Sequence, residues 1–176
     1  MTRPIRIVGD LAFIPLTQGY EAVIDAADVP LVEGHNWCAS VERRKDGTVK
    51  AVYAICNVGP RHQRQRLWLH RVLMSAPPGL EVDHRDGDGL NNRRRGEQGN
   101  LRIATHSQNQ RNTRIRNDNT SGSKGVSWDS ARSKWRAYLK VEGREHHLGR
   151  FDRKEDAEAC VQSARERLHG EWSRAA

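Results

Sequence analysis

The sequence predicts an α+β protein built from short antiparallel strands and a few helices. The first 58 residues hold brief apolar runs separated by Gly-Asp and Gln-Gly pairs, which is typical of short strands joined by turns. Near the C-terminus, three strand-like runs precede a segment with helical periodicity. We therefore expect a β-rich N-terminal segment, a central strand-turn-strand-helix unit, and a C-terminal three-stranded antiparallel sheet packed on one helix.

Residues 1–58 are predicted to form a scaffold. Strands are expected at residues 5–8, 11–16, 20–24 and 49–56, with one or two helical turns within residues 25–32. No grouping of catalytic residue types occurs in this segment. Its predicted role is to support the central unit of the chain.

The central unit, residues 59–112, carries polar residues at the junctions of its expected elements. The run E-V-D-H at 81–84 is strand-like and delivers Asp83 and His84 side by side, and D-G-D-G at 86–89 must turn. Residues 100–105 alternate, with Leu101 and Ile103 on one face. Thr105 or Ser107 can then cap a helix carrying Asn109.

A unit of this size can bring Asp83, His84 and Asn109 to one point. Carboxylate and amide oxygens are hard ligands that suit Mg²⁺ or a similar ion rather than zinc. A neutral histidine beside that ion could deprotonate a water molecule.

These residues resemble the H-N-H motif of the ββα-metal endonucleases. The match places Asp83-His84 at the first element, Asn100 at the central asparagine and Asn109 at the third position. The run L-H-R at 69–71 also looks like the homing-endonuclease branch of that family. The insert at residues 93–99 is longer than the family's pattern.

The resemblance implies a metal-dependent DNA endonuclease that hydrolyses phosphodiester bonds, as a site-specific homing-type or phage nicking enzyme. It implies that Asp83 and Asn109 hold one divalent ion, Mg²⁺ with Mn²⁺ as the alternative, and that His84 is the general base. Asn100 would hold the loop or orient His84 by backbone hydrogen bonds, and His70 is either an auxiliary catalytic group or a packing histidine. One motif per chain implies nicking by a monomer, whereas a double-strand break would need a dimer or two successive events.

The segment 120–176 is predicted to be a sheet-plus-helix DNA-binding domain. Strands are expected at 125–128, 134–141 and 144–151, and Ala157, Val161 and Ala164 form an apolar stripe on a helix over 153–168. The runs K-W-R-A at 134–137 and L-G-R-F at 148–151 are similar to the plant ethylene-response-factor domain. That likeness implies DNA contacts by Lys124, Trp128, Arg132, Lys134, Arg136, Arg144 and Arg150, with Trp135 packing in the core.

Positive charge is concentrated around the central unit. Residues 59–117 hold 12 Lys and Arg against 5 Asp and Glu, so this segment carries a net charge of +7, whereas the whole chain carries +8. Such a surface suits double-stranded DNA as the partner, although a solvated basic loop is the alternative. Further DNA-contact candidates are Arg93, Arg94 and Arg95 in the insert. Arg111, just before a basic linker at 113–119, and Arg114, within that linker, are candidates too.

The remaining composition narrows the class of protein. No run of 18 apolar residues or signal-peptide core occurs, so neither a membrane nor secretion is expected, and we predict the cytoplasm of a bacterium or phage-infected host. Three widely spaced cysteines argue for a reducing compartment and against a structural zinc. The competing functions are a catalytically silent, sequence-specific DNA-binding protein and an RNA-directed nuclease.

Overall fold

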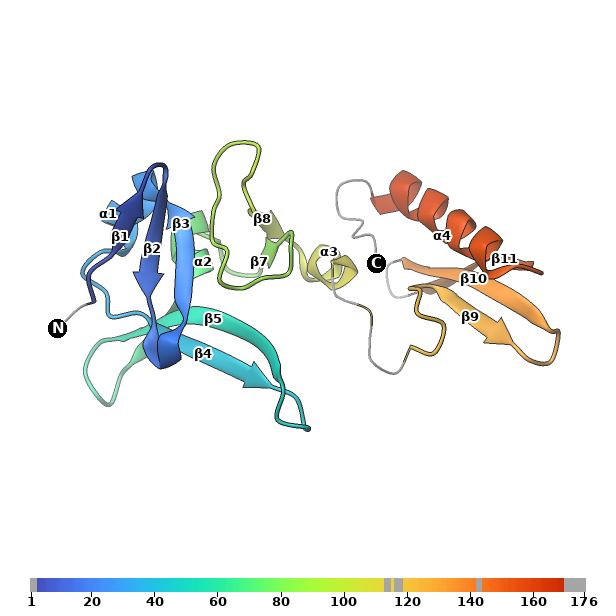
Figure 1. Ribbon diagram of the computed structural model, residues 1–176, viewed down its shortest axis with the longest axis horizontal. Helices are drawn as coiled ribbons and strands as arrows, with labels where there is room; N and C mark the ends of the chain where they lie inside the picture. The colour runs from blue at the N-terminus through green and yellow to red at the C-terminus, as the bar shows by residue number, and fades with distance from the viewer. Residues whose placement is uncertain (1–2, 113–114, 116–118, 142–143, 170–176) are drawn as a thin grey trace. The chain divides into compact units, whose positions relative to one another are not determined.

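The computed structural model describes residues 3–112, 115, 119–141 and 144–169. It divides into two compact units, residues 1–106 and 107–176, which we take separately. Within the described residues, the first unit holds three small antiparallel sheets, and the second holds one sheet with a long helix (Figure 1).

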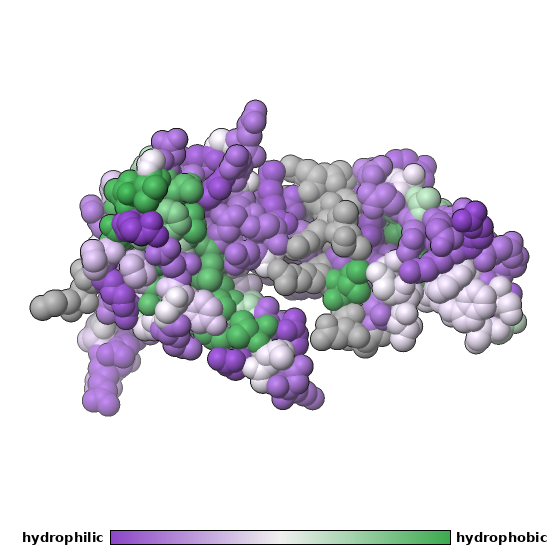
Figure 2. All heavy atoms as spheres, viewed as in Figure 1, coloured by the Kyte–Doolittle hydropathy of each residue, from purple (hydrophilic) through white to green (hydrophobic). Residues whose placement is uncertain are grey.

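The first sheet comes from the N-terminal segment. It consists of β1 (Arg6–Val8), β2 (Leu11–Pro15) and β3 (Glu21–Asp25) in that order. One short 3-10 helix (Thr17–Gly19) lies between β2 and β3, and a second (Ala26–Asp28) leads from β3 into α1 (Val29–Val32). Ala12 and Ile14 of β2 and Ile24 of β3 are buried on one face of this sheet. Ile7 and Val8 are exposed, and Figure 2 shows hydrophobic residues gathered over this part of the unit.

The second sheet contains two strands that the sequence did not reveal. Its order is β4 (Cys38–Arg43), β5 (Val49–Val58) and β6 (Gln65–Trp68), of which only β5 was expected. The chain then enters α2 (Leu69–Met74), where Leu69 and Leu73 are fully buried. This helix comes directly after β6 without a loop.

The third sheet belongs to the central motif. β7 (Glu81–His84) pairs with β8 (Leu101–Ala104) so that Asp83 lies opposite Arg102. α3 (His106–Arg111) begins directly after Thr105, and His106 Nδ1 lies 2.7 Å from Glu81 Oε1 on β7. The predicted order of strand, strand and helix is therefore present. Leu101 is buried, but Ile103 is 38% exposed although both were placed on one face of this strand.

One hydrophobic core serves both the N-terminal segment and the central motif. Ile24 and Trp37 from the first 58 residues are buried together with Leu73, Val82 and Leu101 from the motif. The two segments that the sequence analysis separated at residue 58 thus depend on a shared core.

A buried ion-pair cluster also joins these segments. Asp28 is fully buried, and its carboxylate accepts hydrogen bonds from Arg94 Nε (2.8 Å) and Nη2 (2.8 Å) and from Arg95 Nη2 (2.6 Å). The Asp25 carboxylate accepts the backbone N–H groups of both arginines. The hydrogen bonds from Arg94 are the main reason that the pKa of Asp28 falls from 3.8 to about 2. The cluster fixes the arginine-rich insert to the N-terminal segment.

The second unit matches the predicted sheet and helix. β9 (Val126–Asp129), β10 (Lys134–Val141) and β11 (Arg144–Phe151) are antiparallel with β10 in the centre, and α4 (Lys154–His169) comes after them. Val126, Ala137, Ala157 and Val161 form its buried core, so the apolar stripe of α4 covers one face of the sheet. Among the described helices of the whole chain, none is long and apolar enough to span a bilayer.

The buried cluster yields a stability prediction. Asp28→Asn should lower the free energy of unfolding by about 3–5 kcal/mol in urea titrations, because it leaves two guanidinium groups without their carboxylate. Glu21→Gln, which breaks the exposed pair with Arg6, is the control and should cost no more than about 1 kcal/mol.

The same cluster has a pH signature. Since the pKa of Asp28 is lowered, its stabilisation is complete above pH 3.8 and is lost as the pH falls toward 2. If Asp28→Asn and Glu21→Gln lowered the free energy of unfolding equally at pH 7, the buried cluster would not be important for stability.

Candidate active site

His84 ends β7 in a buried position, where it is 6% exposed. Its Nε2 lies 3.4 Å from Oδ1 of Asn92, which is fully buried. Asn92 Nδ2 donates a hydrogen bond to the carbonyl oxygen of Gly89, so Oδ1 is the acceptor for His84. This network assigns the proton to Nε2 and makes Nδ1 the basic nitrogen of the neutral ring.

Burial favours that neutral form. It lowers the pKa of His84 below 6.5, and the hydrogen bond with Asn92 and the nearby carboxylates of Asp86 and Asp83 oppose the shift only in part. At neutral pH, the imidazole can therefore accept a proton.

Two aromatic rings lie beside His84, and a third packs against both of them. The centroid of His70 lies 5.2 Å from that of His84, and the centroid of Tyr53 lies 5.9 Å from it. Trp68 completes the group, with its centroid 5.7 Å from His70 and 5.8 Å from Tyr53. We call these four residues the ring cluster. β5, β6, α2 and β7 each contribute one member.

His70 has an unusual environment within the ring cluster. Its Nδ1 is buried and has no hydrogen-bond partner among the described residues. Burial, with smaller contributions from His84 and Arg71, lowers its pKa from 6.5 to about 3. His70 is therefore neutral at physiological pH and can donate a hydrogen bond but cannot serve as a cationic acid there.

Asp83 lies next to His84 and is 3% exposed. Its Oδ2 accepts a hydrogen bond from Arg102 Nε (2.7 Å) and lies 2.7 Å from Arg102 Nη2 in an ion pair, and Arg102 is itself buried. The H-N-H resemblance implies that Asp83 is a metal ligand, whereas the ion pair with Arg102 arises from the register of β7 with β8. A carboxylate can bind a cation while accepting a guanidinium, so Asp83 still fits a hard divalent ion.

Asn100 holds the turn after β7. Its Oδ1 accepts the backbone N–H of Asp86, and its Nδ2 donates to Asp86 Oδ1 (2.9 Å) and to the carbonyl oxygen of Asn91 (2.7 Å). These contacts suit the loop-holding role that the resemblance implied. Asn100 can hold this turn without contacting the side chain of His84.

Asn109 lies on α3, in the second unit, and its pairing with Asp83 around a metal stays a prediction. Within the described part of the chain, no group of three or more His, Cys, Asp and Glu side chains could hold a metal ion. An ion at this motif would thus rest on few protein ligands, with water and phosphate oxygens completing its shell.

The arginines of the insert have internal partners. Arg94 and Arg95 bind Asp28, and Arg93 Nη2 donates to the backbone and side-chain oxygens of Gln98. Arg94 is largely enclosed, with 25% of its side chain exposed, so its predicted role in DNA contact gives way to a structural one. Arg114 and the side chain of Arg111 lie outside the described residues.

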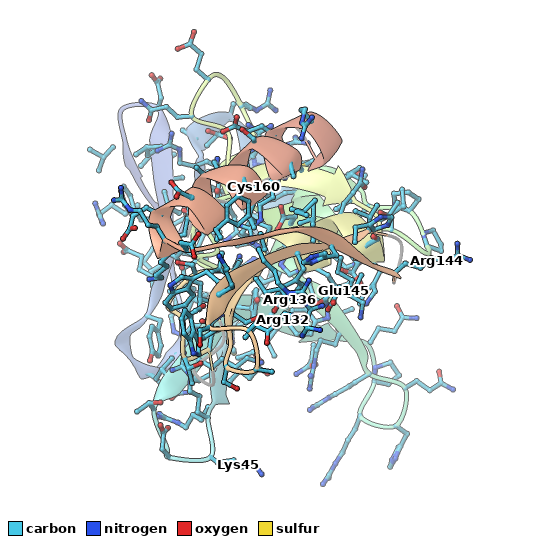
Figure 3. The ribbon with its side chains drawn as sticks, turned by 90° about the vertical axis from the view of Figure 1, so that its right-hand side faces the viewer. Lys45, Arg132, Arg136, Arg144, Glu145 and Cys160 are labelled. Atoms are coloured by element: carbon cyan, nitrogen blue, oxygen red, sulfur yellow. The ribbon has the colours of Figure 1, made fainter. Side chains whose placement is uncertain are left out.

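The sheet of the second unit presents the other DNA-contact candidates. Trp128 is 51% exposed and packs edge-on against the half-buried Trp135. Arg144 is exposed, and Arg136 pairs with Glu145 and lies over the ring of Tyr138 (Figure 3). The remaining candidates have acidic neighbours: Arg132 and Arg150 pair with Asp129, and Lys134 pairs with Asp152.

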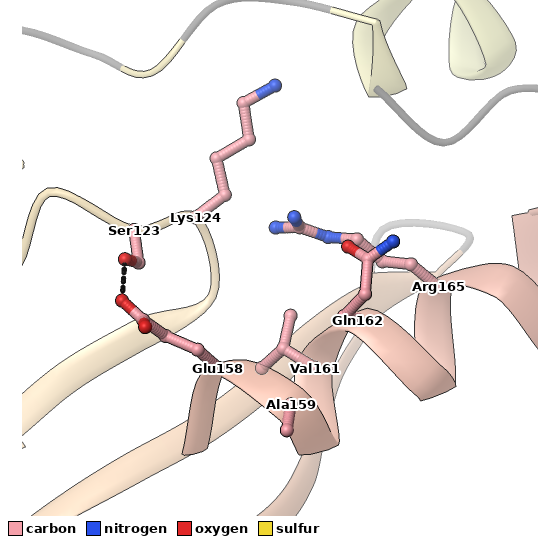
Figure 4. Close-up of a pocket in the computed structure, with 7 residues that line it drawn as sticks. All are labelled: Ser123, Lys124, Glu158, Ala159, Val161, Gln162 and Arg165. Carbon is pink, nitrogen blue, oxygen red and sulfur yellow. Dashed lines mark hydrogen bonds between the residues drawn. The ribbon is translucent and has the colours of Figure 1, made fainter. Parts of the chain in front are cut away.

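Lys124 lines a different feature, a hollow of about 350 Å³ between the loop before β9 and α4 (Figure 4). Arg165 and Gln162 of α4 face it, and Ser123 donates a hydrogen bond to Glu158 at its edge. Burial lowers the pKa of Arg165.

Sequence reasoning missed Tyr53, Trp68, Asn92 and Arg102. The sequence shows paired asparagines at 91–92 and an N-L-R run at 100–102, but neither pattern specifies a side-chain partner. Tyr53 and Trp68 carried no local signal, because only the pairing of β5 with β6 brings them together.

Comparisons with known proteins identify the family of this chain. Residues 75–111 match the family described as HNH endonuclease. The chain is 37% identical to protein 3.8 of Escherichia phage T7 over 98 residues, which cover 56% of this chain and 77% of the phage protein. No solved structure matches. The family match ends before the second unit's sheet, so the likeness of that unit to the ethylene-response-factor domain stays a prediction.

The buried state of His70 leads to a prediction about pH. Between pH 6.5 and 3, the unfolded chain takes up a proton at His70 that the folded chain does not, so the free energy of unfolding falls as the pH drops. His70→Phe keeps a ring and removes this effect. From pH 7 to pH 4, the variant should gain stability relative to the wild type by about 1 kcal/mol per pH unit in urea titrations. Parallel profiles would mean that folded His70 takes up the proton.

Proposed function

Because the chain belongs to the family of phage T7 protein 3.8 and carries an HNH endonuclease domain, we propose that it is a metal-dependent endonuclease that hydrolyses phosphodiester bonds in double-stranded DNA. The observation that carries the proposal is the state of His84, a buried neutral imidazole held by Asn92 beside Asp83. Such a group has the chemistry of a general base.

His84 would take a proton from the attacking water at Nδ1. Asn92 holds the proton on Nε2 and limits rotation of the ring, so the lone pair keeps one direction during the reaction. The attacking water would add to phosphorus as its proton passes to His84, and the bond to the 3′-oxygen would break with its electron pair on that oxygen. The 3′-oxygen would then take a proton from solvent water, which leaves 5′-phosphate and 3′-hydroxyl ends.

Asp83 and Asn109 would hold the divalent cation, for which we propose Mg²⁺, with Mn²⁺ as the alternative. When bound, the cation neutralises charge on the phosphoryl group and stabilises the leaving oxygen. Arg102 fixes the Asp83 carboxylate from the side of β8, so that its position does not depend on the metal alone.

His70 and Asn100 have supporting roles in this proposal. Neutral His70 would donate a hydrogen bond to a phosphate oxygen, which would give its buried ring a polar partner. Asn100 would keep the turn after β7 in place through its bonds to Asp86 and Asn91.

The second unit would recognise the target site. A three-stranded sheet can enter a major groove, and Trp128 and Arg144 are exposed on its strands. We propose a monomeric enzyme of a phage-infected or bacterial cell that nicks one strand at a preferred site. A catalytically silent DNA-binding protein is the second candidate, because the Arg102 ion pair already satisfies Asp83 in part.

One prediction of the proposed function concerns His84 as the general base. Incubation of supercoiled plasmid with wild-type protein and Mg²⁺ or Mn²⁺ should yield open circles, and EDTA should abolish the reaction. His84→Ala should slow nicking by about 10²- to 10⁴-fold while DNA affinity changes little. His35→Ala is the matched control, because His35 lies outside the ring cluster. DNA binding without cleavage under either metal would favour the silent alternative.

The second prediction concerns recognition. The double variant Trp128→Ala/Arg144→Gln should bind a preferred site about tenfold more weakly and discriminate less against other sequences. Each of the two substitutions removes a contact with the duplex. Metal-dependent nicking of excess plasmid should persist. Arg153→Gln removes an exposed charge outside the sheet and is the control. Unchanged discrimination in the double variant would place recognition elsewhere.

A further inference from the structure

We propose that residues 59–66, which comprise the turn after β5 and the first two residues of β6 and are here called the basic hairpin, form a DNA-backbone contact that leads one strand to the ring cluster. The proposal rests on the proposed function for its substrate. It adds a binding surface in the first unit to the one proposed for the second.

The chemistry of the basic hairpin suits phosphate. Residues 59–66 read G-P-R-H-Q-R-Q-R, with three arginines, one histidine and no acidic residue. Arg61, Arg64 and Arg66 are all exposed. Guanidinium groups match phosphate oxygens in geometry and charge.

These arginines also differ from their neighbours in having no internal partner. Within the described residues, Arg61, Arg64 and Arg66 make no ion pair or side-chain hydrogen bond. Every other arginine of residues 3–106 has a protein partner, as Arg94 and Arg102 illustrate. The arginines of the first unit that lack an internal partner therefore lie on this hairpin.

The register of the second sheet connects the basic hairpin to His84. Side chains two residues apart in a strand point to the same face, so Arg66 shares the face of Trp68 about 7 Å away along β6. Trp68 contacts His70, whose ring lies beside His84. A strand of DNA whose phosphates bind Arg64 and Arg66 would thus run toward the general base.

The neighbouring hairpin offers a comparison within the same sheet. The turn between β4 and β5 carries Arg43, Arg44 and Lys45, and Lys45 stands at its tip in Figure 3. Arg43 donates to the carbonyl oxygen of Gly47, and Arg44 donates to that of Val49. Its cations are partly committed to holding the turn, whereas those of the basic hairpin are not.

The test measures binding apart from cleavage. Full-length wild type and the triple variant Arg61→Gln/Arg64→Gln/Arg66→Gln are titrated in EDTA against a fluorescent 30-base-pair duplex of arbitrary sequence at several salt concentrations. Loss of three phosphate contacts should reduce the slope of log K against log salt by about 2.7 and weaken binding at 0.1 M salt by about 100-fold. The control variant Arg43→Gln/Arg44→Gln/Lys45→Gln removes equal charge and should shift both quantities far less.

Two further arms separate the possible outcomes. Each single arginine variant should lower the slope by about 0.9, which keeps the test decisive if the triple variant melts early. With Mg²⁺, the triple variant should raise KM for plasmid nicking and leave kcat at saturating DNA near that of the wild type.

A wild-type slope and affinity in the triple variant, or equal losses in the two triple variants, would overturn the proposal even if the protein cuts DNA. Loss of binding only in the basic-hairpin variant would support it even if no nuclease activity is found, so the two proposals can fail separately. If duplex RNA competes as well as duplex DNA does, DNA would be overturned as the partner of this surface.

Discussion

The pairing of β3 with the loop before β8 is the constraint on which the site depends. The backbone N–H of Val23 donates to the carbonyl oxygen of Leu90, and the N–H of Asn92 donates to the carbonyl oxygen of Val23. These bonds fix the backbone of Asn92, whose side chain holds His84. The N-terminal sheet is therefore part of the active-site support, and a change in β3 would reach the imidazole through two hydrogen bonds.

Charge in the first unit is divided between structure and surface. Arg94, Arg95 and Arg102 are used internally, where buried carboxylates make each guanidinium costly to remove. The arginines of the basic hairpin have no such partners and can meet a polyanion at little cost to folding. Net charge alone could not separate these two groups, because only burial and pairing distinguish them.

Several elements could be predicted because their signals are local. The strand that ends in Asp83-His84 and the sheet and helix of the second unit follow from alternation and helical spacing. β4 and β6 escaped prediction because their sequences, C-A-S-V-E-R and Q-R-L-W, are too polar or too short to alternate clearly. Both become strands because the long, apolar β5 lies between them and satisfies their backbone groups.

The sequence by itself determined the residues that could do the chemistry, since Asp83, His84, Asn100 and Asn109 stand at recognisable spacings along the chain. Only the tertiary structure decided their surroundings. It placed Arg102 against Asp83 through strand register, and it gathered Tyr53, Trp68 and His70 around His84 from three further elements. The physical reason is that ion pairing and desolvation act between groups that are close in space, and spacing along the chain does not encode that distance.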